Sequence, residues 1–172
     1  MAKTDSFFIR ASVPVAAAYN EVSVDLGAYV DALGKSVLKI HRVSTKYPRV
    51  APSAQANAHT SMCEFQLTTQ RQTVIVPLTD KSLIASGALQ VGYGVPSGAP
   101  SLAAPTVITT DTDTSPDVYT NGYIVGVEQI YLAGQLANEA DFSGGATVDI
   151  IMECTVETLS QSAAMALALS QQ

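Results

Sequence analysis

Residues 146–157 read Ala-Thr-Val-Asp-Ile-Ile-Met-Glu-Cys-Thr-Val-Glu, and this stretch decides the fold. Its apolar side chains fall at every second position, namely Val148, Ile150, Met152, Cys154 and Val156. Polar residues stand between them, apart from Ile151, and a period of two is typical of a strand with one buried face. A strand of about ten residues, roughly 33 Å long, needs partner strands on both edges and an apolar layer against its inner face. The stretch therefore predicts a β-sandwich or barrel.

The same alternation recurs along the chain. Strands are expected at 7–18, 21–26, 36–47, 61–69, 73–76, 89–95 and 122–132. Because Pro14 cannot donate a hydrogen bond to a sheet, the first of these is expected at an edge or a bulge. Seven to nine strands with little helix indicate an all-β protein, an antiparallel β-sandwich.

Two short helices and two loops complete the expected architecture. Thr79 can cap an internal helix that ends at Gly87, and Ser160 can cap a C-terminal helix within 159–170. Residues 96–121 are rich in Pro, Gly, Ser, Thr and Asp, and we expect a long loop with one short strand at 106–109. A second loop is expected at 133–145.

The chain has 172 residues and is expected to form one domain, with residues 1–19 as an N-terminal arm or strand and 159–172 as a C-terminal helix or tail. Charged residues make up 14% and hydrophobic residues 47%, so the surface must be largely uncharged, which suits packing against neighbours. The apolar runs are shorter than the roughly 18 residues that suggest a membrane span. No signal-peptide pattern is present, and we expect synthesis in a cytoplasm.

Charge is divided unevenly along the chain. Residues 1–81 hold all nine basic side chains against six acids, a net charge of +3, whereas residues 82–172 hold nine acids and no Lys or Arg, a net charge of −9. Unlike patches can steer copies of one protein together. Alternatively, both halves contribute to one sandwich and the asymmetry averages out in space.

Few constellations suggest chemistry. Asp111, Asp113 and Asp117 could hold a calcium ion if backbone carbonyls completed the shell, and a solvated acidic loop is the alternative. Cys63 and Cys154 share strand faces with apolar residues and are expected to be core thiols rather than a disulfide or, with His59, a zinc site. No nucleophile elbow or dinucleotide fingerprint is present, so we predict no enzyme, no catalytic residues and no cofactor other than the calcium candidate.

A basic strip follows one predicted strand and its exit: Lys35, Lys39, Arg42, Lys46 and Arg49. It could meet nucleic-acid phosphates, or the acids of a neighbouring subunit. With a net charge of −6, direct nucleic-acid binding is not the preferred interpretation. The candidate contacts between subunits are Lys39, Arg42, Lys46, Arg49, Leu159, Met165, Leu167 and Leu169.

With these strands placed, the chain resembles the single jelly-roll coat proteins of tailless icosahedral viruses. The resemblance covers residues 20–158 and rests on the strand at 22–30, the turn at 31–34, the strand at 38–43, the helical link at 78–89, and a strand at 121–127 paired with 148–156. Such coats often carry a basic N-terminal arm, but residues 1–10 hold only Lys3 and Arg10 against Asp5. The resemblance implies a structural protein that self-assembles into a capsid shell of many copies, with other virion proteins as further partners, located in the virion and made in the host cytoplasm.

A second hypothesis belongs to a different class. A β-sandwich binding module, for carbohydrate or another ligand, could use the 96–121 loop. Sugar sites usually need exposed aromatic side chains, and Tyr93, Tyr119 and Tyr123 near the loop ends are the available platform. The native mass discriminates the two hypotheses, since a module is expected as a monomer of 18 kDa and a coat as a megadalton particle.

Overall fold

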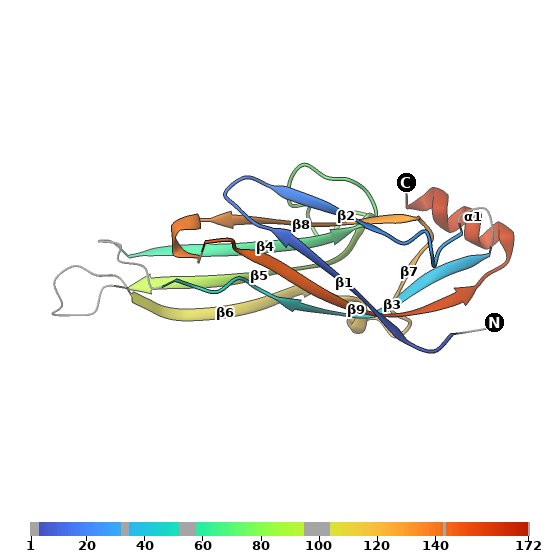
Figure 1. The fold of residues 1–172 in the computed structure, drawn as a ribbon, viewed down its shortest axis with the longest axis horizontal. Coiled ribbons are helices and arrows are strands. Elements are labelled where there is room, and N and C mark those ends of the chain that lie inside the picture. Colours follow the sequence, from blue (N-terminus) through green and yellow to red (C-terminus); the bar gives the residue numbers. More distant parts are fainter. Residues whose placement is uncertain (1–3, 32–34, 52–57, 95–103, 143, 172) are drawn as a thin grey trace.

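A computed structural model describes residues 4–31, 35–51, 58–94, 104–142 and 144–171. They form two antiparallel sheets that pack face to face (Figure 1). The four-stranded sheet has the order β1-β9-β3-β7, with β1 at Phe7–Pro14, β9 at Thr147–Thr158, β3 at Ser36–Lys46 and β7 at Tyr123–Val125. The five-stranded sheet has the order β2-β8-β4-β5-β6, with β2 at Asn20–Asp25, β8 at Gln129–Ala137, β4 at His59–Thr68, β5 at Leu83–Gly94 and β6 at Ala104–Thr114.

The chain moves back and forth between the sheets. β1, β3, β7 and β9 belong to one sheet, while β2, β4, β5, β6 and β8 belong to the other. Apart from β6, this is the strand order of an eight-stranded jelly roll. The predicted antiparallel sandwich is confirmed, and so is its jelly-roll character.

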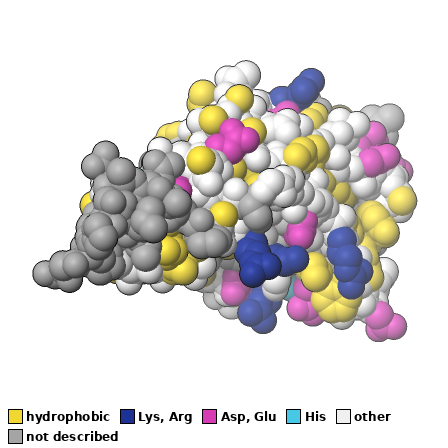
Figure 2. Space-filling model, turned by 60° about the vertical axis from the view of Figure 1, so that its left-hand side comes forward, with side chains coloured by type: hydrophobic (Ala, Val, Ile, Leu, Met, Phe, Trp, Pro, Cys, Tyr) yellow, Lys and Arg dark blue, Asp and Glu magenta, His cyan; other side chains and the backbone are white. Residues whose placement is uncertain are grey.

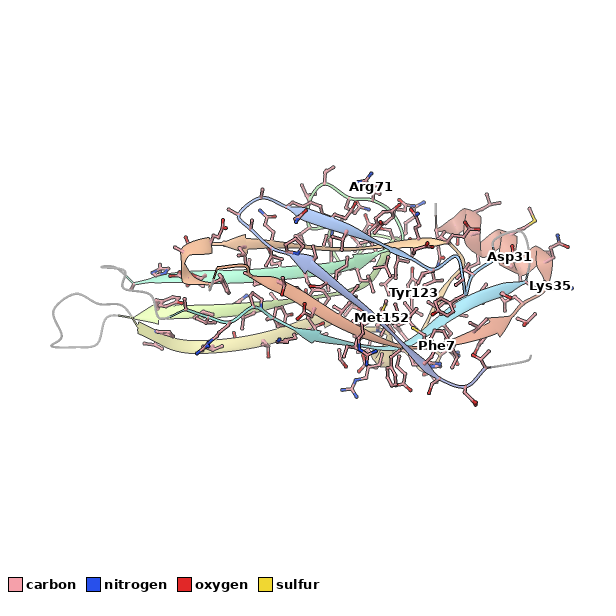
Figure 3. The ribbon with its side chains drawn as sticks, viewed as in Figure 1. Phe7, Asp31, Lys35, Arg71, Tyr123 and Met152 are labelled. Carbon is pink, nitrogen blue, oxygen red and sulfur yellow. The ribbon has the colours of Figure 1, made fainter. Side chains whose placement is uncertain are left out.

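The core lies between the two sheets and is built from the alternating apolar residues. β9 contributes Val148, Ile150, Met152 and Cys154, all at most 1% exposed. Figure 3 labels Met152 near the middle of the molecule, where the sheets overlap. As expected for a strand that organises the sheet, β9 pairs with β1 on one edge and with β3 on the other. β1 is an edge strand, as predicted, but it ends at Pro14 instead of continuing to residue 18.

The expected internal helix at 79–87 is wrong. Residues 78–82 form turns, and β5 begins at Leu83 and runs through Gly87. Leu83, Ile84 and Ala85 are buried in succession, because this part of β5 is covered on both faces. The residues 73–76 are likewise not a strand. Apart from the C-terminal helix, the described residues contain two 3-10 turns, η1 at Pro116–Val118 and η2 at Glu139–Asp141.

The expected strand at 122–132 is two strands in different sheets. Gly122 adopts φ 64°, which lets the chain turn into β7. The backbone crosses between sheets at 126–128, where Leu26 N donates to Glu128 O, and then continues as β8. β7 pairs with β3 and not with 148–156, which corrects the expected pairing. β8 also extends through the first part of the expected 133–145 loop.

The expected 96–121 loop is largely structured. Residues 95–103 lie outside the described part of the chain, but residues 104–114 form β6, which is far longer than the strand expected at 106–109. β6 pairs with β5 and forms one edge of its sheet. The segment was predicted as a loop because its Thr and Asp content is typical of loops. An edge strand needs no buried face, so the alternating apolar residues used to predict the other strands are missing here.

The C-terminal helix is confirmed. α1 spans Gln161–Ser170 and closes one end of the sandwich (Figure 1). Ser160 caps it by accepting a hydrogen bond from Ala163 N at 3.3 Å. Among the described residues, no helix is long and apolar enough to cross a membrane.

Candidate interaction surfaces

Three residues of the basic strip, Lys39, Arg42 and Lys46, lie on β3 beside acids of β9, while Lys35 precedes the strand and Arg49 follows it. Lys39 Nζ lies 3.3 Å from Glu157 Oε1, and Lys46 Nζ lies 3.8 Å from Asp149 Oδ2. Arg42 stands opposite Glu153 in the ladder. The two oppositely charged parts of the sequence therefore partly neutralise each other within one sheet. On the face shown in Figure 2, Lys and Arg side chains lie close to Asp and Glu side chains instead of forming one continuous patch.

The exposure of the basic side chains differs along the strip. Lys39 is mostly covered, with 16% of its side chain exposed, whereas 83% of the Lys46 side chain is exposed. Arg42 and Arg49 are also exposed, and Lys35 lies at the α1 end of the molecule (Figure 3). The exposed candidates for a contact between subunits are thus Arg42, Lys46 and Arg49, at the opposite end of β3 from α1.

One edge of β3 is only partly paired. β7 is three residues long and pairs with Leu38–Ile40, so beyond Ile40 no described strand occupies that edge. Beside this edge lies a small cavity of about 180 Å³ whose lining includes Val43 and Thr45 of β3 and Thr110 and Thr112 of β6. η1, in the connection from β6 to β7, packs against β3, so this edge is contacted by another element although it is not paired with a strand.

The three aspartates of the calcium candidate are spread over two elements. Asp111 and Asp113 lie on β6 and Asp117 in η1, and all three are exposed. Asp113 Oδ2 accepts a hydrogen bond from Ser86 Oγ at 3.2 Å. Burial, and then the nearby charge of Asp113, raises the pKa of Glu64 above its ordinary value. Among the described residues, no group of three or more His, Cys, Asp or Glu side chains is placed to hold a metal ion.

α1 packs on its own sandwich through one face. Ala164 and Ala168 are buried, and Leu167 packs so closely on Gly126 that a Cβ there would lie 3.0 Å from Leu167 Cγ. Met165 and Leu169 point the other way and are 45% and 68% exposed. Of the apolar contact candidates, Leu167 is thus partly used within the chain, whereas Met165 and Leu169, one turn apart, are available.

The end of α1 is held by Gln171, which sequence reasoning did not single out. Its side chain donates from Nε2 to Ile124 O at 2.7 Å and accepts from Gly126 N at 2.8 Å. Its carbonyl accepts from Thr69 Oγ1 at 3.2 Å. Since these groups belong to the end of β7 and to the turn after β4, Gln171 ties α1 to both sheets.

A buried polar cluster was also missed. Asp141 is buried, and its Oδ2 lies 2.5 Å from His59 Nε2 and also accepts a hydrogen bond from Ser61 Oγ. The His59 ring stacks on Tyr93 at 4.6 Å between centroids. Because Ser61 and His59 bind the same carboxylate oxygen, the serine is not aligned for activation by the histidine. The cluster anchors η2 to β4, and no local sequence pattern connects residues so far apart.

The cysteines and tyrosines can now be placed. Cys63 and Cys154 are free, buried core thiols, as predicted, and burial raises the pKa of each to about 12. Tyr93 is 3% exposed, so it cannot belong to an exposed platform for sugars. Tyr119 is 53% exposed, while Tyr123 is partly buried.

Comparison with known proteins finds similar solved structures but no match in sequence. No family model and no curated protein sequence matches the chain. Similar solved structures include VP1 of trichodysplasia spinulosa-associated polyomavirus in complex with 3'-sialyllactose, with 9% identity over 89% of this chain and 94% of that chain and a TM-score of 0.46. The unassembled VP1 pentamer of Merkel cell polyomavirus has 8% identity, 88% and 94% coverage and a TM-score of 0.38. The jelly-roll fold rests on the strand order described above.

Proposed function

We propose that the protein is a structural subunit that assembles in many copies into a viral capsid shell. The observation that carries this proposal is the outward face of α1, where Met165 and Leu169 are exposed one turn apart on a helix that is otherwise anchored. Neighbouring exposed apolar side chains on a fixed helix are a candidate surface for contact with another protein. The jelly-roll strand order supports the proposal, since viral capsids are among the proteins built on this fold.

The partners follow from the same proposal. The chief partner is a second copy of the chain, with other virion proteins as further partners, and the protein is located in the virion after synthesis in the host cytoplasm. Direct contact with nucleic acid is not proposed, because the basic residues of β3 are partly paired with acids of β9.

The experiment is a measurement of native mass by light scattering. We expect a megadalton particle, and a monomer of 18 kDa would overturn the proposal in favour of the binding module. The double variant Met165→Lys/Leu169→Lys should reduce assembly, because it places charges in an apolar contact.

The matched control is Ala166→Lys/Ser170→Lys, which adds the same charges at the same spacing on exposed positions about 100° further round α1. Equal loss of assembly in both double variants would show that added charge alone is responsible, and the apolar face would lose its role. Deleting residues 160–172 is a poorer test than these variants, since it would also remove the hydrogen bonds of Gln171.

A further inference from the structure

β6 is the strand that the eight-stranded jelly-roll order does not account for, and it lies at one edge of the five-stranded sheet. In Figure 1 it runs below β5, its strand partner among the described residues. All residues from 105 to 113 are exposed, although successive side chains point to opposite faces of a strand. Val107 and Ile108 are 56% and 57% exposed. Both faces of β6 are therefore accessible to a partner, and its outer edge has no described strand beside it.

This outer edge is protected at its two ends but not in its middle. The pairing with β5 shifts register twice, which leaves Thr106 and Asp113 as extra residues on β6. Bulges and charged side chains near the end of an edge strand discourage other strands from pairing there. Between the two irregularities, residues 107–112 read Val-Ile-Thr-Thr-Asp-Thr and pair regularly with β5. Because β-branched residues favour strands, a partner strand would be confined to this segment.

We propose that the partner is a second copy of the chain, and that the two β6 strands pair edge to edge, antiparallel, about a two-fold axis at Thr109. The axis stands perpendicular to the strands and to the sheet, so the two five-stranded sheets become one continuous sheet. Val107 of each copy then stands opposite Asp111 of the other, Ile108 opposite Thr110, and Thr109 opposite itself. This inference rests on the proposed self-association and names a contact that would contribute to it.

Charge and the two irregularities select this register. The two Asp111 carboxylates lie four positions apart along the ladder, about 13 Å at 3.3 Å per residue. This separation exceeds the screening length of about 8 Å at physiological ionic strength. An axis at Thr110 would bring the two carboxylates to about 7 Å along the ladder, and an axis at Ile108 would draw the irregular Thr106 into the pairing. With the axis at Thr109, the paired segment also places two Thr side chains face to face, a favourable cross-strand pair.

Cysteine cross-linking tests both the contact and its register. Thr109→Cys would meet its own counterpart, because the Cα atoms of opposite residues lie about 4.5–5.5 Å apart, which suits a disulfide. We expect a disulfide-linked homodimer under mild oxidation. The native thiols do not interfere, since Cys63 and Cys154 are buried.

Val107→Cys is the matched control on the same face of the same strand. Its counterpart would lie about 13 Å away along the ladder, so this variant alone should not cross-link. A mixture of Val107→Cys with Asp111→Cys should cross-link again, because these two positions stand opposite each other. If Thr109→Cys cross-linked no faster than Val107→Cys, the inference would be overturned.

Opposite charges at the axis give a test without a covalent bond. Thr109→Glu and Thr109→Lys should each weaken dimerisation about fivefold, since like charges face each other, and an equimolar mixture should restore it. Ser23→Glu, an exposed position on the far edge strand β2, should leave dimerisation unchanged. Sedimentation equilibrium is measured in the Met165→Lys/Leu169→Lys background, so that contacts of α1 do not contribute. Folded variants that dimerise no better when mixed would contradict the pairing at Thr109.

The two proposals can fail separately. Particles of the wild-type chain together with no cross-link at Thr109→Cys would leave the shell and overturn the β6 contact. A cross-linked dimer of a chain that forms no particles would leave the β6 contact and remove the shell.

Discussion

Replacing Gly87 by alanine tests the placement of this residue in the middle of β5. A Cβ at Gly87 would lie 2.6 Å from Asp111 O and 2.9 Å from Tyr47 Oη. The carbonyl belongs to the backbone of β6, so it cannot turn aside as a flexible side chain could. Forcing extra volume into a packed site costs about 1–3 kcal/mol, and the loss of unfolded-state freedom returns about 0.4–1 kcal/mol. We expect a net loss of about 1–2 kcal/mol, which lowers Tm by about 3–6 °C in a chain of this length.

Gly92→Ala is the matched control on the same strand. Its nearest neighbour would be Val107 Cβ at 3.7 Å, an ordinary contact, so only the effect on the unfolded state remains and Tm should stay level or rise slightly. The measurement is thermal unfolding of the unassembled protein, followed by circular dichroism. If Gly87→Ala proved as stable as Gly92→Ala, the close approach of β6 to β5 at this point would be refuted.

Two further predictions concern buried groups. Gln171→Ala should lower the free energy of unfolding by about 1–3 kcal/mol, because it leaves buried backbone groups of β7 and of residue 126 without partners; Gln161→Ala, an exposed position on α1, should change it little in the same urea titration. Burial raises the pKa of Cys63 and Cys154 from 9.0 to about 12, so their contribution to stability is complete below pH 9 and is lost as pH rises toward 12. Thiol titration of the folded protein near pH 9 would contradict this.

The strands that were predicted correctly have apolar side chains with a period of two, and this period indicates which side chains are buried. β9 alternates between buried and less buried residues over most of its length, and β3 and β4 do so over part of theirs, so the positions of these strands could be predicted from the sequence. α1 could be found because a capping serine precedes a run of helix-forming residues. Each of these signals lies within the element itself or in the residue next to it.

The errors occurred where local signals depend on distant partners. β5 was misread at Leu83–Gly87 because several apolar residues in succession, closed by a glycine, are also typical of a short helix. The glycine is needed instead for the approach of β6, which no local pattern reveals. The change of sheet at 126–128 was missed because the alternation of Val125 and Val127 continues smoothly through it.

The candidate contacts between subunits also depend on distant residues that the sequence does not show to be neighbours. They concern the charge pattern. The sequence shows a basic half and an acidic half, but only the ladder shows that β3 lies against β9 and that Lys39 and Lys46 are matched there with Glu157 and Asp149. This pairing removes much of the long-range attraction that the sequence suggested. What remains is local, since β6 carries Asp111 and Asp113 at one edge of its sheet and the exposed bases of β3 are Arg42 and Lys46. In the proposed assembly, such charges would set the orientation of two copies more than their affinity, because exposed ion pairs contribute only about 0.2–1 kcal/mol each. The affinity of the proposed assembly would then come mainly from apolar contacts such as those of Met165 and Leu169, so a rise in salt should alter the orientation of neighbouring copies before it dissociates the assembly.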